Sequence, residues 1–284
     1  ITTNNVRDIA NEEIDKRELG VNGADHPLPE YLHYAKFDDV YADDAKWYYD
    51  QVDHGGLSAS LQKRAKKNHV NIGMFNSPIG LCSARRLTDV VERDYDWYYN
   101  DTPTFVVEVS GIAGIRYASI GIAEIGTNLT EKTIASEKGS KYWRCLPGCM
   151  LDGINEKGVM AEMNVVPTNG SEWETQGDRD INGHGGIRWI LDNAMSAGYA
   201  ASNIAERAYI PKALKDLGFS LHFMICDKDE TWIVEDGTPY LCDEETPVMT
   251  NYRLYMPEGE EDLFGSGYAR AEILKNRANP ITDV

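Results

Sequence analysis

A thiol, a guanidinium group and a carboxylate follow one another closely at Cys82, Arg93 and Asp96. A cysteine attacks well only as its thiolate, which needs a nearby cation and a base. Arg93 would favour the thiolate. If the bond between Leu81 and Cys82 were cut, the new α-amino group of Cys82, which titrates near neutral pH, would be a base for its own side chain. Asp96 would hold the ammonium form, so this spacing predicts a cysteine nucleophile activated by its own amino group.

The bulk composition limits the class of protein. With 284 residues, of which 42% are hydrophobic, the chain can bury a core as one large domain or two smaller ones. A net charge of -18 and a pI near 4.7 argue against nucleic acid or an anionic membrane surface as partner. Mean hydropathy is -0.46 and no apolar run reaches membrane-spanning length. The chain begins with Ile1 rather than Met, so a signal peptide could already have been removed, and the compartment, cytoplasmic or secreted, stays open. The sequence also leaves open whether the protein assembles into a homo-oligomer.

The five cysteines leave at least one thiol outside any disulfide framework. Cys145 and Cys149 have a spacing unlike that of paired zinc ligands, and no His-x-x-His follows them. The sequence therefore predicts no metal site and no cofactor. We interpret Cys145, Cys149, Cys226 and Cys242 as packing residues, because unpaired cysteine is among the most buried residue types.

The first part of the chain, residues 1–81, is charged and has helical periodicity. Val6, Ile9, Ala10 and Ile14 trace an apolar stripe between charged residues. An aromatic segment follows around Trp47, and we interpret a basic stretch over 57–68 as a solvated helix face. We therefore expect a mainly helical segment over residues 1–81, which ends after a turn at 76–78, and a second unit over 82–284.

Beyond this turn the pattern changes to strands and a few helices. Strands are predicted at Leu81–Arg86, Thr104–Ser110, Tyr117–Ile125, Leu221–Cys226, Thr231–Glu235 and Pro247–Asn251, and a strand, turn and strand over Met150–Asn164. One helix is predicted around Ile187–Ala194, ended by Gly198, and another over Ala201–Leu217. This order of strands and helices favours an α+β fold of antiparallel sheets with helices on one side.

Five motifs occur in a fixed order along the chain. They are Cys82-Ser83, Arg93-x-x-Asp96, Leu151-Asp-Gly-Ile-Asn-Glu-Lys-Gly-Val159 with Asn164, Leu221-His-Phe-Met-Ile-Cys-Asp-Lys-Asp229 with Val234-Glu235, and Val248-Met-Thr-Asn251. With these motifs, most of residues 82–280 resembles the choloylglycine hydrolase and penicillin V acylase family of N-terminal nucleophile hydrolases. The resemblance implies a four-layer αββα sandwich, in which two antiparallel sheets lie between helical layers.

The resemblance also implies a mechanism for these residues. Cys82 matches the nucleophile, whose sulfur attacks an amide carbonyl and forms a thioester. Its own α-amine matches the general base and later the acid toward the leaving amine. Asp96 matches the carboxylate that orients this amine, and Arg93 matches the guanidinium beside the thiol. Taken without the resemblance, Arg93 and Asp96 would be interpreted as a surface ion pair.

The oxyanion of such a reaction needs hydrogen-bond donors that are placed in advance. Asn251 matches the family's side-chain donor, and Asn164 matches the residue whose backbone N–H completes the oxyanion hole. Arg270 matches the late arginine of the family site, although the residues just before it differ. The alternatives are that both asparagines cap strands or turns and that Arg270 is a helix-surface arginine.

The residues before Cys82 raise the question of self-cleavage. The long upstream segment is similar to that of the acid ceramidase relatives, in which a sizeable segment precedes the nucleophile. Because catalysis needs a free amine, which a peptide-bonded Cys82 lacks, we predict a zymogen in which the Cys82 thiol attacks the Leu81 carbonyl and releases the new N-terminus. At the other end, the family's catalytic domain continues past the late arginine, so this chain, ending at Val284, either lacks those strands or replaces them.

The sequence leaves the substrate open within one class, a small N-acyl amide. Bile-salt, penicillin V and fatty-acyl side chains all call for an apolar pocket, which Trp97 and Tyr98 would line if they are not core residues. A papain-like thiol hydrolase that pairs Cys82 with a histidine is one alternative. His184, in a glycine-rich loop, is the candidate for that role, whereas we interpret His222 as a core histidine. The other alternative is a non-processed, non-catalytic binding protein of the same fold.

Overall fold

A computed structural model describes residues 32–38, 82–87, 90–94, 104–124, 145–168, 173, 176–216, 218–255 and 266–276. Its strands and its α- and 3-10 (η) helices are, in chain order, β1 (Leu32–Phe37), β2 (Ser83–Arg86), β3 (Val91–Asp94), β4 (Thr104–Val109), β5 (Ser119–Glu124), η3 (Leu146–Cys149), β6 (Met150–Asn155), β7 (Met160–Pro167), β8 (Ile181–Asn182), η5 (Gly183–Gly185), α6 (Gly186–Asn193), α7 (Ala197–Arg207), β9 (Ala208–Tyr209), α8 (Lys212–Lys215), β10 (Phe219–Cys226), β11 (Thr231–Glu235), β12 (Thr238–Leu241), β13 (Val248–Met249) and α9 (Ser266–Asn276).

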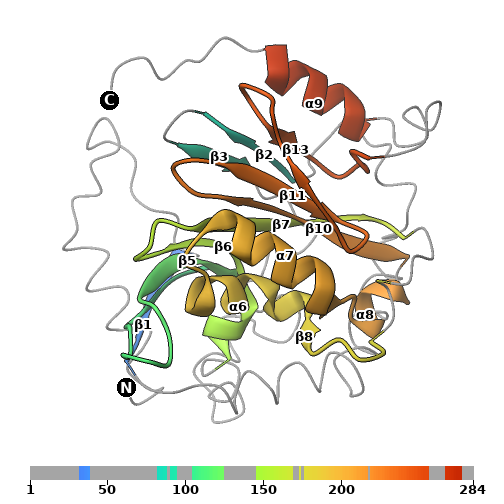
Figure 1. Cartoon of the computed structure of the whole chain (residues 1–284). Coiled ribbons are helices and arrows are strands. Elements are labelled where there is room, and N and C mark those ends of the chain that lie inside the picture. The colour runs from blue at the N-terminus through green and yellow to red at the C-terminus, as the bar shows by residue number, and fades with distance from the viewer. Residues whose placement is uncertain are drawn as a thin grey trace.

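These elements form the predicted four layers, which follow one another across the molecule (Figure 1). An eight-stranded sheet has the order β1-β4-β5-β6-β7-β10-β11-β12, and α6 and α7 pack on one of its faces. A three-stranded sheet of order β13-β2-β3 lies on the other face and is covered in turn by α9. The α+β sandwich inferred from the motifs is confirmed. No helix in the described part of the chain is long and apolar enough to cross a membrane.

Strand β10 shows why the layers stack in this way. All eight of its residues are buried, and successive side chains of a strand point to opposite faces. Leu221 and Phe223 join the main core with α6 and α7. Met224 points the other way and packs with Ile233 and Met249 between the two sheets. A strand that is buried on both faces therefore marks the centre of the sandwich.

The predicted hairpin between β6 and β7 is confirmed. Gly158 turns the chain with a φ of 80°, a conformation that glycine adopts without steric cost. The buried Asn155 side chain holds the turn, because its Oδ1 accepts from the backbone N–H groups of Lys157 and Val159, each at 3.0 Å. Its Nδ2 donates to Ala194 O at 2.8 Å, which ties the hairpin to the end of α6.

The helices differ from the prediction at their junction. Helix α6 ends at Asn193, and Ser196 caps a new helix, α7, whose second residue is Gly198. The prediction that Gly198 ends a helix is therefore wrong. A Cβ on this glycine would lie 2.8 Å from the Glu230 carboxylate, which instead accepts the Gly198 N–H at 2.9 Å. Gly198 therefore lies inside α7, where the Glu230 side chain approaches it closely, and does not mark the end of a helix.

Residues 1–81 were expected to be mainly helical, and the one stretch of them that the structure describes, 32–38, contains a strand. Strand β1 pairs in parallel with β4 and buries Ala35 against the main core. This strand was not predicted, because a parallel partner far along the chain supplies its hydrogen bonds and leaves no local signal. The apolar stripe, the aromatic segment and the basic stretch lie outside the described residues.

Three short strands differ from the prediction. Strands β3 and β12 were not predicted, and β13 is confined to Val248–Met249 within the predicted Pro247–Asn251. The five cysteines form no disulfide in the described structure, and Cys145, Cys149 and Cys226 are buried as expected of packing residues, with Cys242 half-buried. No group of three or more potential metal ligands occurs among the described residues.

Candidate active site

Cys82 lies directly before β2, on the small sheet, with 3% of its surface exposed. The alternation along β2 directs Cys82, Ala84 and Arg86 toward the large sheet, and Arg86 accordingly donates to Thr231 Oγ1 on β11 at 2.7 Å. Arg85 points the other way and donates to Leu274 O in α9. The nucleophile predicted from the sequence therefore sits at the boundary between the two sheets.

Two predicted residues hold the backbone of Cys82 to the large sheet. Arg270, on α9, donates through Nη1 to Cys82 O at 2.9 Å and through Nη2 to Asn251 Oδ1 at 3.2 Å. Asn251, which follows β13, donates in turn through Nδ2 to Val165 O on β7 at 2.8 Å. The chain of contacts from Cys82 through Arg270 and Asn251 to β7 is thus continuous.

Arg93 makes a second connection between the sheets. It lies on β3 opposite Ala84, and donates through Nη1 to Asp152 Oδ2 at 2.6 Å and through Nη2 to Met163 O at 2.9 Å. Its Nε lies 3.5 Å from Glu162 Oε2. Burial disfavours the guanidinium charge, but the attraction of Asp152, and of Glu162 and Cys82 when they are ionised, outweighs this effect and raises the pKa of Arg93 above its usual value.

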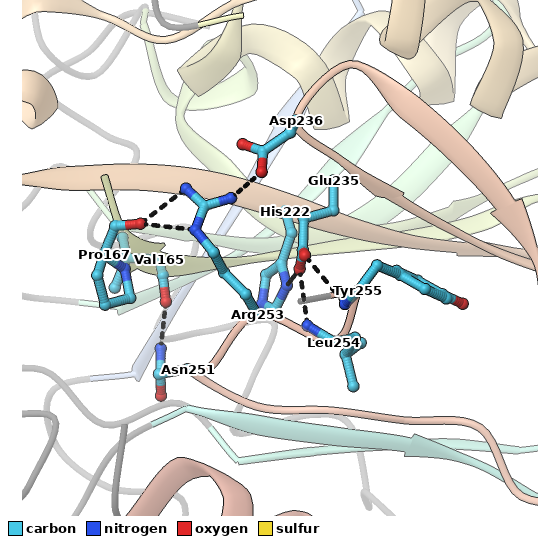
Figure 2. Close-up of polar contacts among 9 residues, drawn as sticks. All are labelled: Val165, Pro167, His222, Glu235, Asp236, Asn251, Arg253, Leu254 and Tyr255. Carbon is cyan, nitrogen blue, oxygen red and sulfur yellow. Dashed lines mark hydrogen bonds and ion pairs between the residues drawn. The ribbon is translucent and has the colours of Figure 1, made fainter. Parts of the chain in front are cut away.

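These contacts use an open edge of β7. Pairing between β6 and β7 runs only from Met160 to Glu162 along β7. The alternate carbonyls beyond that point accept from side chains instead of a strand, Met163 O from Arg93 and Val165 O from Asn251. Pro167 O accepts from Arg253 at 3.1 and 2.7 Å, as Figure 2 shows beside the Asn251 contact. Buried carbonyls need such partners.

Asn164 lies between the two anchored carbonyls. It is 2% exposed and faces His222 across the β7–β10 pairing. Neither its Oδ1 nor its Nδ2 has a hydrogen-bond partner within the described residues. A buried amide without partners is costly, so the arrangement offers a donor and an acceptor at the point where Arg93 and Asn251 converge on β7.

A buried histidine and glutamate lie next to Asn164. His222 is fully buried, as expected of a core histidine, and its Nδ1 is 3.2 Å from Glu235 Oε2 (Figure 2). Glu235 also accepts the Leu254 and Tyr255 backbone N–H groups at 3.1 and 3.3 Å. Burial opposes ionisation, but the bonds from His222 and Leu254 prevail and lower the pKa of Glu235. This pair was missed, although both residues stood within the quoted motifs.

Glu162 is a further acidic residue that the sequence reasoning missed. It lies on β7 two positions before Asn164, on the same face, and is 2% exposed. Burial raises the pKa of Glu162 to about 8, although the charge of Arg93 opposes this rise. The available signal was a glutamate at an inward position of a strand whose neighbours are apolar, since glutamate is rarely buried without a partner.

The structure brings together five predicted residues, namely Cys82, Arg93, Asn164, Asn251 and Arg270. The remaining predicted ones, Leu81, Asp96, Trp97 and Tyr98, lie outside the described residues. His184 is elsewhere, because it lies in η5, which packs with η3 and α6 on the helical side of the large sheet. It is therefore separated from Cys82 by that sheet.

Comparison with known proteins adds a family to this geometry. Residues 142–256 match the family model described as linear amide C-N hydrolases, choloylglycine hydrolase family. This match confirms the resemblance for the three motifs between Leu151 and Asn251. No curated protein matches the chain.

Solved structures that are similar to the chain have low identity to it. Two of them are structures of a conjugated bile acid hydrolase from Clostridium perfringens. The first has 20% identity, a TM-score of 0.34 and coverage of 49% of this chain and 39% of that chain. The other has 17% identity, a TM-score of 0.41 and coverage of 62% and 54%. Penicillin V acylase from Agrobacterium tumefaciens has 15% identity, a TM-score of 0.31 and coverage of 65% and 47%. The chain spans about half the length of these structures.

Proposed function

We propose that this chain, which carries the choloylglycine hydrolase family pattern over residues 142–256, is a self-processing cysteine amidase. It would hydrolyse the linear C–N amide bond of an N-acyl compound through a thioester at Cys82. The observation that supports this most is the double connection around the nucleophile. Arg93 on one side, and Arg270 with Asn251 on the other, join the region of Cys82 to β7 on both sides of Asn164.

In the proposed acylation step, Cys82 Sγ attacks the carbonyl carbon of the substrate amide, and the α-amine of Cys82 takes the thiol proton. Negative charge develops on the carbonyl oxygen. The C–N bond then breaks, the leaving amine takes the proton from the α-ammonium group, and the acyl group remains on sulfur as a thioester. Asp96 would hold the ammonium group, and Arg93 would stabilise the thiolate before attack.

In the proposed deacylation step, water attacks the thioester carbonyl while the α-amine removes its proton. The C–S bond breaks, and the carboxylic acid leaves as the thiol is restored. The oxyanion of both steps needs prearranged donors. Asn251 and Asn164 are proposed for this role, because Asn251 bonds β7 at Val165 O, next to Asn164, and Arg270 links Asn251 to Cys82 O.

The same thiol would free its own amino group. Cys82 Sγ would attack the Leu81 carbonyl, the peptide C–N bond would break, and the acyl group would move from nitrogen to sulfur. Water would then hydrolyse that thioester, which releases a carboxylate at Leu81 and the amine at Cys82. Before this step the chain would be an inactive zymogen, because a peptide-bonded Cys82 has no basic amine.

The substrate is proposed only as a class, a small molecule in which an acyl group is joined to an amine by a linear amide. Bile-salt, penicillin V and fatty-acyl amides all belong to this class. Trp97 and Tyr98, just after the Arg93-x-x-Asp96 motif, are proposed to line the acyl pocket.

Intact mass and N-terminal sequencing, before and after incubation with a reductant at neutral pH, test the proposal. We expect a larger fragment that begins Cys82-Ser83-Ala84 and then hydrolyses a member of an acyl-amide panel. Cys82→Ala should stay whole, whereas Cys242→Ala, the control at the least buried of the five cysteines, should be processed. Processing of Cys82→Ala would show that a separate protease cuts the chain. A wild-type chain that stays whole and hydrolyses no amide would favour a non-catalytic binding protein.

A further inference from the structure

Glu162 lies inside the candidate site, yet the mechanism above gives it no role. It faces the space between the sheets, two residues from Asn164 along β7, which is roughly 7 Å in an extended strand. Neither carboxylate oxygen accepts a hydrogen bond from the part of the chain that the structure describes. A buried carboxylate that is ionised and lacks donors is strongly disfavoured, so this group requires an explanation.

The described charged and titratable groups around Glu162 come from three strands and from Cys82, just before β2. Arg93 on β3 places Nε 3.5 Å from Glu162 Oε2. Asp152 on β6 pairs directly with Glu162 in the sheet and accepts Arg93 Nη1 at 2.6 Å. Cys226 on β10 is affected by the charge of Glu162, and burial raises the pKa of that thiol to about 12, so it stays neutral. Cys82, directly before β2, also acts on Arg93 through its charge.

One guanidinium group therefore faces two carboxylates and a thiol that has to ionise. Asp152 has the shorter contact and takes the Nη1 hydrogen bond. If Glu162 were also ionised, the three groups Arg93, Asp152 and Glu162 would sum to one negative charge, which would oppose a thiolate at Cys82. If Glu162 is protonated, the three sum to zero and the field of Arg93 at the sulfur is less cancelled.

We propose that Glu162 is a positioning residue that carries a proton in the working enzyme, and that this proton leaves the charge of Arg93 available to the Cys82 thiolate. The inference builds on the function proposed above and adds a residue to its machinery. Burial raises the pKa of Glu162 to about 8, so the carboxyl holds its proton at neutral pH. Above about pH 8 the Glu162 carboxyl ionises, and its negative charge disfavours the Cys82 thiolate. This happens in the same pH range in which the thiolate fraction of Cys82 would otherwise rise.

Alkylation of Cys82 by iodoacetamide, followed by peptide mass spectrometry, measures thiolate without any substrate and without self-cleavage. The test thus stays valid even if the chain proves not to be an amidase. The quantity compared is the ratio of the rate at about pH 9.5 to the rate at about pH 7. We expect Glu162→Gln, which cannot ionise, to have a ratio roughly threefold to tenfold above wild type, because one pKa unit corresponds to a tenfold change in ionised fraction.

Glu92→Gln is the matched control. Glu92 is next to Arg93 in sequence but pairs with Arg85, whose side chain reaches α9 on the far face of the small sheet. Its ratio should equal that of wild type. An equal ratio in wild type and Glu162→Gln would overturn the proposal. So would equal changes in Glu162→Gln and Glu92→Gln.

Infrared difference spectroscopy gives a second readout that does not depend on thiol access. Subtracting the Glu162→Gln spectrum from that of wild type isolates the carboxyl band of Glu162. We expect the band of a protonated carboxylic acid at neutral pH, lost with a midpoint near a pKa of about 8. A band that is already absent at neutral pH would show an ionised Glu162 and overturn the inference.

Discussion

Replacing Arg93 by methionine tests the buried charge group that joins the two sheets. Arg93 is 9% exposed and makes two close contacts, 2.6 Å to the Asp152 carboxylate and 2.9 Å to Met163 O. Removing one partner of a fully buried ion pair costs about 3–5 kcal/mol, because the other charge is left uncompensated. The Asp152 side chain is 23% exposed, and solvent screening reduces the cost. We therefore expect Arg93→Met to lower the free energy of unfolding by about 2–4 kcal/mol near neutral pH.

The pH dependence of this loss follows from Glu162. Burial raises the pKa of Glu162 in the folded protein to about 8, above its pKa in the unfolded chain. Its contribution to the free energy of unfolding is therefore full below the unfolded pKa and is lost as the pH rises toward the folded pKa. In wild type the loss ends once Glu162 ionises beside Arg93. Without Arg93 the carboxyl stays protonated to higher pH, and stability continues to fall by about 1.4 kcal/mol per pH unit. The difference between the two proteins should therefore widen above pH 8.

Urea unfolding from about pH 6 to about pH 10, followed by tryptophan fluorescence, measures both effects. Arg85→Met is the control, because Arg85 is 3% exposed and bonds Glu92 at 2.6 Å on the face toward α9. It should be destabilised without the widening above pH 8. A loss below about 1 kcal/mol for Arg93→Met, the size of an exposed ion pair, would refute the reasoning. So would a loss that does not depend on pH.

Three further predictions concern the turn, the late arginine and a helix start. Asn155→Ala should lower the free energy of unfolding by about 2–4 kcal/mol in urea titrations, because four hydrogen bonds between its buried side chain and the backbone are lost. A change below about 1 kcal/mol would contradict this. Arg270→Met should lower kcat/KM on the best acyl amide roughly tenfold to a hundredfold, since the contact to Cys82 O positions the nucleophile; unchanged kinetics would remove Arg270 from the site. Gly186→Ala should lower Tm by several degrees in calorimetry, because its Cβ would lie 2.8 Å from the Phe223 ring, and an unchanged Tm would show that the ring moves aside easily.

The sandwich was predictable from the sequence where the signals are local. The β6–β7 hairpin follows from a turn between two apolar runs, and Thr231–Glu235 forms the strand β11 with the predicted bounds. Strand β1 was not predictable in this way, because its hydrogen bonds come from a parallel neighbour distant in sequence. Gly198 was misread for a related reason, since the close approach of Glu230 is a tertiary contact.

The candidate site was predictable as far as the motifs reached. Cys82, Arg93, Asn164, Asn251 and Arg270 were predicted from the motifs and the family resemblance. Arg270 bonds both Cys82 O and Asn251, and Arg93 and Asn251 bond the carbonyls on either side of Asn164. What the sequence could not supply is which carbonyl each side chain contacts, because this depends on where β6 stops pairing with β7. The raised pKa of Glu162 and the lowered pKa of Glu235 depend on their burial and on their neighbours in the fold, so the sequence alone did not indicate them.

The open edge of β7 has a consequence for how such a site can change over time. Arg93, Asn251 and Arg253 bind the main-chain carbonyls of Met163, Val165 and Pro167, none of which depends on the side chain of its residue. Their spacing follows the repeat of an extended strand, roughly 7 Å for every second residue. The side chains of these three residues can therefore change one at a time while the contacts to their carbonyls are kept. A strand that is held through its main chain keeps its position while its side chains vary, so substrate specificity can change without loss of the catalytic framework.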